Sequence, residues 1–115
     1  MSDTKSMNDL ETGKQIGEMA RRIAEKFQPD RIILFGSHAR GEANFDSDVD
    51  LLVLMNVSGS RREMANRIDL ALADRELPVD VIVMTPEQFE KDRHFAGTLA
   101  RPVDRDGRIL YERPK

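Results

Sequence analysis

The segment spanning residues 31–54 constrains the fold of this chain more than any other part of the sequence. It contains two short apolar runs, at residues 32–35 and 49–54, separated by a glycine-serine pair, a short basic stretch and an acidic loop. Short apolar runs bounded by turn residues favour buried strands. Because the connection between them is too short for a parallel crossover, we predict that the two strands are antiparallel.

A third strand is predicted at residues 79–84, where β-branched residues follow a helix predicted over residues 61–75. Ser60 and Glu63 form the start signal of that helix. A strand, a helix and another strand imply a right-handed crossover, so the second and third strands should be parallel. The predicted fold class is therefore α/β, with a small mixed sheet flanked by helices.

The rest of the chain adds helices around this sheet. Apolar residues recur at helical spacing over residues 8–27, and residues 1–6 are expected to be disordered. Thr85 and Pro86 predict a helix start, with the helix running to about residue 93. A last helix is expected from about residue 98, followed by a short edge strand near residues 109–111. We predict a single domain over residues 1–115.

Three aspartates are candidate metal ligands. Asp48 and Asp50 would point to the same face of an extended segment, and Asp80 begins the neighbouring parallel strand, so the three carboxylates should converge at one edge of the sheet. At ~4 Å, two carboxylates repel by about 4 kcal/mol at an effective dielectric of about 20. A hard cation such as Mg²⁺ removes that cost. In the alternative reading, Asp48 and Asp50 cap a turn and Asp80 lies on a solvated strand edge.

Gly36, Ser37 and Arg40 are candidate phosphate-binding residues. Glycine lets the backbone approach a ligand closely, and the serine hydroxyl and nearby N–H groups can donate to phosphate oxygens. The alternative is an ordinary turn at the end of a strand, with Arg40 paired to an acid of the loop. His38 and His94 lack a recognisable catalytic partner, so the sequence assigns them no chemical role.

The motif GSHARG at residues 36–41, followed by SDVDL at residues 47–51, resembles the signature of the DNA polymerase β-like nucleotidyltransferase superfamily. Within it, the chain is most similar to the minimal nucleotidyltransferases, or MNT proteins. The resemblance implies the nucleotidyltransferase fold. It also implies that Asp48 and Asp50 ligate two Mg²⁺ ions, while Asp80 completes the site of the attacking hydroxyl.

The same resemblance implies transfer of a nucleoside monophosphate, AMP from ATP, to an acceptor hydroxyl with release of pyrophosphate. Minimal nucleotidyltransferases are paired with a HEPN-type toxin, which implies that this chain is an antitoxin and modifies that partner. Two alternatives remain open. The chain could be a non-catalytic antitoxin that covers the active site of its partner. It could also be a homo-oligomeric nucleotidyltransferase acting on a small molecule such as an antibiotic.

Composition excludes several other classes. The net charge of −3 and pI of about 5.4 show no basic excess, which argues against a nucleic-acid partner. The absence of cysteine excludes disulfides and thiolate metal sites. No apolar stretch approaches the ~18 residues of a membrane span, and no signal-peptide core is present at the N-terminus. We therefore expect a cytoplasmic protein.

Overall fold

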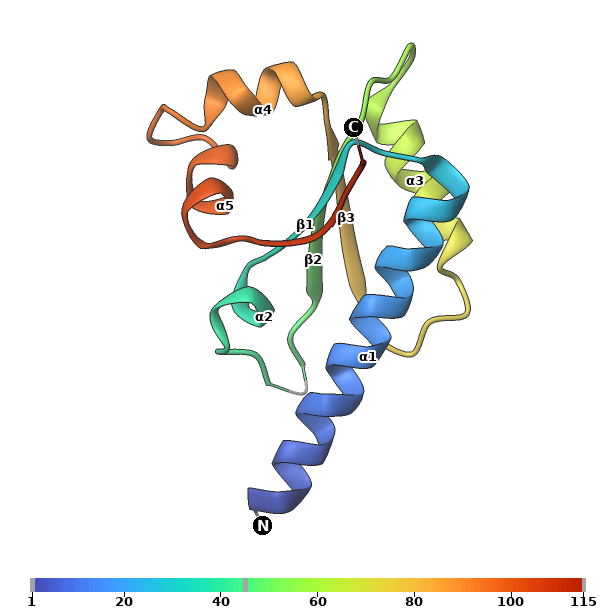
Figure 1. Cartoon of the computed structure of the whole chain (residues 1–115), viewed down its shortest axis with the longest axis vertical. Helices are drawn as coiled ribbons and strands as arrows, with labels where there is room; N and C mark the ends of the chain where they lie inside the picture. The colour runs from blue at the N-terminus through green and yellow to red at the C-terminus, as the bar shows by residue number, and fades with distance from the viewer. Residues whose placement is uncertain (1, 45, 115) are drawn as a thin grey trace.

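The structure, a computed structural model, describes residues 2–44 and 46–114, with side chains from residue 10 onward. Its centre is a four-stranded sheet with the order β3-β2-β1-β4 (Figure 1). β1 is antiparallel to β2, and β2 is parallel to β3, as predicted. β1 is also antiparallel to β4, an orientation that the sequence did not specify. The strands are β1 (Arg31–Phe35), β2 (Val49–Leu54), β3 (Val79–Met84) and β4 (Arg108–Glu112).

Helices cover both faces of the sheet. The long helix α1 and helix α3 lie on one face, and α4 and α5 lie on the other (Figure 1). The short helix α2 follows β1 directly, at the end of the sheet where β2 begins. The helices are α1 (Ser2–Phe27), α2 (Ser37–Arg40), α3 (Arg61–Ala71), α4 (Pro86–Asp92) and α5 (Ala100–Asp106). None of the described helices is both long and apolar enough to span a membrane.

Alternation along β2 builds two apolar layers. Val49, Leu51 and Val53 are fully buried against the α1 and α3 side, and Leu52 and Leu54 are fully buried against the α4 and α5 side. Successive strand residues point to opposite faces, so a strand that is covered on both faces is apolar throughout. This explains why residues 51–54 form a continuous apolar run. Asp50, the polar residue of this strand, is only half-buried and lies outside these two apolar layers.

Two predicted helix starts are confirmed in detail. The Ser60 hydroxyl accepts a hydrogen bond from the Glu63 N–H at 3.2 Å, at the start of α3. The Thr85 hydroxyl accepts one from the Gln88 N–H at 3.1 Å, before α4. Each bond satisfies a backbone donor that has no partner inside its helix.

The limits of three helices differ from the prediction. α1 begins at Ser2 rather than at residue 8, because no proline or glycine interrupts residues 2–6 and an existing helix gains one hydrogen bond for each residue added. Residue 1 lies outside the described residues. α3 ends at Ala71 instead of residue 75, because the Arg75 guanidinium donates to the carbonyls of Asp69 and Leu72 and holds a tight turn. α5 begins at Ala100, two residues later than predicted.

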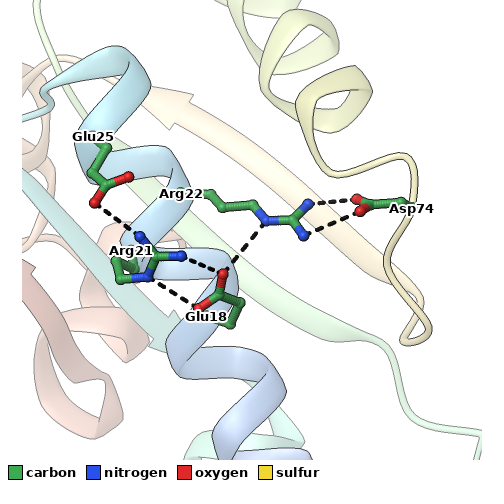
Figure 2. Close-up of polar contacts among 5 residues, drawn as sticks. All are labelled: Glu18, Arg21, Arg22, Glu25 and Asp74. Atoms are coloured by element: carbon green, nitrogen blue, oxygen red, sulfur yellow. Dashed lines mark hydrogen bonds and ion pairs between the residues drawn. The ribbon is translucent and has the colours of Figure 1, made fainter.

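Polar contacts attach α1 to the segment that follows α3. The Arg22 guanidinium makes two hydrogen bonds with the Asp74 carboxylate, at 2.5 and 3.1 Å (Figure 2). These bonds lower the pKa of Asp74. Exposed ion pairs add little to stability, so α1 is held mainly by its buried apolar residues. Those residues are Ile16, Met19, Ala20 and Ile23.

Candidate active site

Asp50 and Asp80 lie side by side at the start of two adjacent strands. The parallel register of β2 and β3 pairs them directly, and alternation places both on the sheet face that α4 and α5 cover further along. Asp48 lies just before β2, two residues from Asp50. Asp48 and Asp80 are exposed, whereas Asp50 is half-buried. The structure therefore brings the three predicted carboxylates to one edge of the sheet.

The proximity of these carboxylates changes the chemistry of Asp50. Burial raises the pKa of Asp50 above its ordinary value, and the negative charges of Asp80 and Asp48 raise it further. The nearby His38 and Arg40 act in the opposite direction. An ionised Asp50 is thus unfavourable here without additional positive charge, and a bound cation would supply that charge.

The donor set fits a hard cation in its chemistry. All three side chains offer carboxylate oxygens, the ligands that Mg²⁺ prefers. As the side chains stand, the described residues contain no group of three acidic, histidine or cysteine side chains positioned to hold a metal ion. Asp48 and Asp80 are exposed, so the packing of the core does not fix their side chains. Metal binding therefore requires a change of side-chain conformation, with the backbone already in register.

Gly36 brings the backbone against Asp50. Its backbone angles, φ 76° and ψ −156°, lie in a region that is essentially restricted to glycine. A Cβ atom built at this position would overlap the Oδ2 atom of Asp50. Ser37, which is half-buried, follows as the first residue of α2. The predicted glycine-serine turn thus lies directly beside the carboxylate group.

Arg40 forms the alternative pairing that the sequence left open. Its Nε atom donates to Glu42 Oε1 at 2.8 Å, and this bond raises the pKa of Arg40. Asp50 and Asp106 also stabilise the charged form of Arg40. The guanidinium therefore lies within electrostatic reach of the site while it is bound to an exposed loop acid.

His38 has a contact that the sequence did not reveal. Its Nε2 atom lies 3.2 Å from the carbonyl oxygen of Ser47, which connects α2 to the acidic loop next to Asp48. The Ser47 hydroxyl accepts a hydrogen bond from the Asn44 N–H at 2.9 Å, so it closes a turn in that loop. His38 occupies a variable position of the motif, so only the folded structure indicates its role. His94 contacts Glu90 instead, at 3.7 Å.

A hollow of about 460 Å³ lies between α1, α2 and β4. His38 and Gly41 line it together with Gly13 and Gly17 of α1 and Arg108 of β4. The three aspartates do not line this hollow. The raised pKa of Asp50 and the negative charges beside it point to the aspartates, and not to this hollow, as the candidate cation site.

A comparison with protein families identifies the family of the chain. The model of the nucleotidyltransferase domain matches residues 16–111, which include β1, β2, β3 and all but the last residue of β4. The chain belongs to the nucleotidyltransferase domain family. The match confirms the predicted enzyme class and the resemblance on which it was based.

Curated relatives carry a more specific name. A protein of Methanocaldococcus jannaschii that is named as a candidate protein adenylyltransferase is 32% identical over 103 residues, which cover 85% of this chain and 96% of the relative. A second protein of that organism with the same description is 39% identical over 54 residues, covering 47% of this chain and 54% of the relative.

Solved structures confirm the fold. A candidate nucleotidyltransferase from Sulfolobus solfataricus superposes with a TM-score of 0.61 at 21% identity, covering 91% of this chain and 84% of that chain. A toxin-antitoxin structure with AMP-PNP superposes with a TM-score of 0.53 at 24% identity, covering 82% of this chain and 73% of that chain. A mutant of the MntA-HpeT toxin-antitoxin superposes with a TM-score of 0.56 at 21% identity, covering 84% of this chain and 72% of that chain. At these identities the likeness supports the α/β architecture.

Proposed function

We propose that this nucleotidyltransferase moves AMP from ATP to a hydroxyl group on a partner protein and releases pyrophosphate. The observation that carries the proposal is the pairing of Asp50 with Asp80 beside the glycine-serine turn. The name of the 32%-identical relative, a candidate protein adenylyltransferase, supports a protein acceptor.

Each residue of the site has a role in this proposal. Asp48, Asp50 and Asp80 would hold Mg²⁺, two ions by family resemblance, and bound Mg²⁺ would neutralise the triphosphate and lower the pKa of the attacking hydroxyl. Asp80 is exposed at the open side of the site, where its carboxylate can accept the proton of the incoming hydroxyl.

The turn after β1 would bind the phosphates. The absence of a side chain at Gly36 would let a phosphate approach the backbone beside the aspartates, and the Ser37 hydroxyl can donate to a phosphate oxygen. Arg40 would exchange Glu42 for a phosphate, since a guanidinium binds either group through charged hydrogen bonds.

The proposed acceptor is a tyrosine or another hydroxyl of a HEPN-type toxin, with this chain acting as its antitoxin. Two structural neighbours described as toxin-antitoxins support a protein partner, and AMP-PNP in one of those structures supports an adenine nucleotide as donor. The second candidate is an antitoxin that neutralises its partner by binding alone.

The test uses purified protein with Mg²⁺ and α-labelled ATP, with and without the product of the neighbouring gene. We expect label on that product, and loss of label in Asp48→Asn and Asp50→Asn. Asp46→Asn is the matched control, because Asp46 is an exposed acid of the same loop whose described contact is made by its backbone N–H.

The outcomes separate the candidates. Complex formation without label, and neutralisation that survives Asp50→Asn, would support the non-catalytic antitoxin. Label on an added aminoglycoside, but not on protein, would support the small-molecule enzyme.

A further inference from the structure

The outer edge of β3 has open backbone hydrogen-bonding groups. The carbonyls of Pro78 and Met84 accept hydrogen bonds from Val49 and Met55, at 2.8 and 3.1 Å, so the even-numbered residues of this segment face β2. By alternation, the odd-numbered residues Val79, Val81 and Val83 direct their N–H and C=O groups away from the sheet. β3 is last in the strand order, and no other described strand pairs with this side.

The two edges of the sheet differ in their protection. The register of β4 with β1 is interrupted by an irregularity, and β4 has charged residues at both ends, Arg108 and Glu112. β3 pairs with β2 over six consecutive positions without a shift, and it contains neither proline nor lysine. Bulges, charges and prolines are the usual devices that prevent edge-to-edge pairing. β3 lacks most of these devices and is therefore suited to pair with another strand.

Helix α3 contributes an apolar residue beside this edge. A shallow hollow of about 650 Å³ lies between the first half of α3 and β3, and a second of about 480 Å³ lies at the end of α3, beside the loop that leads to Pro78. Leu70 borders one of them with 72% of its surface exposed, the highest value among the exposed large apolar side chains described. The α3 residues that line the hollows include Arg62, Ala65, Asn66, Asp69 and Leu70, and Ala73 lines one of them just after α3.

Charge along this surface changes from one end to the other. α3 runs opposite to β3, so Arg61 and Arg62, at the start of α3, lie near the end of β3. Neither arginine belongs to an ion pair in the described part of the chain. Glu76 lies at the opposite end, where the charge of Arg75 is paired with Asp69. A surface that is basic at one end and acidic at the other is complementary to an antiparallel copy of itself.

We propose that this surface binds a second copy of the chain. The two β3 strands pair in antiparallel orientation about a two-fold axis, and the sheet continues from one copy into the other. The basic start of each α3 then faces the acidic end of the other copy, and the two Leu70 side chains lose contact with water. A two-fold axis requires this kind of self-complementarity.

Sedimentation velocity of the wild-type chain tests the proposal. We expect a species of about twice the 13.1 kDa chain mass that dissociates on dilution and weakens with added salt. Leu70→Glu should shift the protein to monomer. Val81→Pro should do the same, because it removes an outward N–H that β2 does not use. Phe95→Glu is the matched control, since Phe95 is 61% exposed outside this surface. Circular dichroism checks that each variant is folded.

A second measurement uses the absence of cysteine in the chain. A single cysteine at position 81 or 82 lies close to its own copy when two β3 strands pair about their midpoint, and should form an intermolecular disulfide on mild oxidation. Ile109→Cys on β4 should not. The proposal is wrong if the wild type remains monomeric up to about 100 µM, or if Ile109→Cys crosslinks as fast as Val81→Cys and Ile82→Cys. Pairing with a different protein, without self-association, would equally overturn it. Asp80 is left unchanged, so the result does not depend on the proposed catalytic site.

Discussion

The carboxylate of Asp50 occupies the space that a Cβ atom on Gly36 would fill. This contact joins two parts of the motif that are separated in the sequence: the turn that ends β1 and the acid that begins β2. Phe35 pairs with Asp50 in the antiparallel register, so the turn follows directly beyond that pair. The glycine is therefore required by its neighbour as well as by its backbone angles.

Gly36→Ala should reduce both stability and activity. The backbone strain alone should cost about 1–3 kcal/mol of unfolding free energy. The overlap with Oδ2 also displaces Asp50, so nucleotide transfer should fall further than the stability loss explains. Chemical denaturation and the label-transfer assay measure the two effects.

Gly59→Ala is the control for this change, because a Cβ at Gly59 meets nothing within 4 Å and its φ is not in the left-handed region. An active Gly36→Ala enzyme would show that Asp50 does not need its present position.

Asp50→Asn should stabilise the protein at neutral pH in the absence of divalent cations. Burial, followed by the charges of Asp80 and Asp48, raises the pKa of Asp50 above its ordinary value of 3.8. The folded protein thus holds this proton more tightly than the unfolded chain does. Protonation of Asp50 therefore stabilises the folded protein. This stabilisation is complete below the ordinary pKa and is lost as the pH rises through the raised pKa. The unfolding free energy of Asp50→Asn should therefore exceed that of the wild type at pH values above the raised pKa of Asp50, and the difference should vanish in acid.

Thermal melting with and without Mg²⁺ completes this test. Mg²⁺ should raise the midpoint of the wild type, because a cation offsets the repulsion, and should raise that of Asp50→Asn much less. Asp46→Asn should behave as the wild type does. Equal Mg²⁺ responses in all three proteins would mean that the cation does not bind at Asp50.

The sequence allowed the sheet, and the position of the aspartates in it, to be predicted. Connection lengths alone implied that β1 and β2 are antiparallel and that β2 and β3 are parallel, and a parallel pair brings Asp50 and Asp80 together. This reasoning needs only chain connectivity and strand periodicity, which are local properties.

Details that depend on tertiary contacts were not predictable. The contact of His38 with Ser47 joins residues across a loop, and no spacing rule anticipates it. The early end of α3 depends on the position of the Arg75 guanidinium over two carbonyls. In both cases a long side chain selects one of several reachable partners, and the choice is made by the surrounding fold.

Ser60→Ala should destabilise the protein by about 1 kcal/mol, because the Glu63 N–H loses its acceptor at the start of α3. Urea unfolding measures this loss. Ser58→Ala is the control, since Ser58 is an exposed residue of the same loop before the helix. Equal effects of the two substitutions would mean that the hydroxyl of Ser60 does not cap α3.

Gly13→Ala and Gly17→Ala should each stabilise the protein by up to about 1 kcal/mol. Both glycines lie inside α1, where alanine is the better helix former, and a Cβ at either position meets nothing within 4 Å. Both also line the hollow of about 460 Å³ that adjoins His38. Thermal melting gives the stability, and label transfer shows whether the hollow is used. Raised stability with unchanged KM for ATP and for the acceptor would mean that the hollow binds neither substrate. Raised stability with a higher KM for one of them would place that substrate against α1, and lowered stability would contradict the prediction.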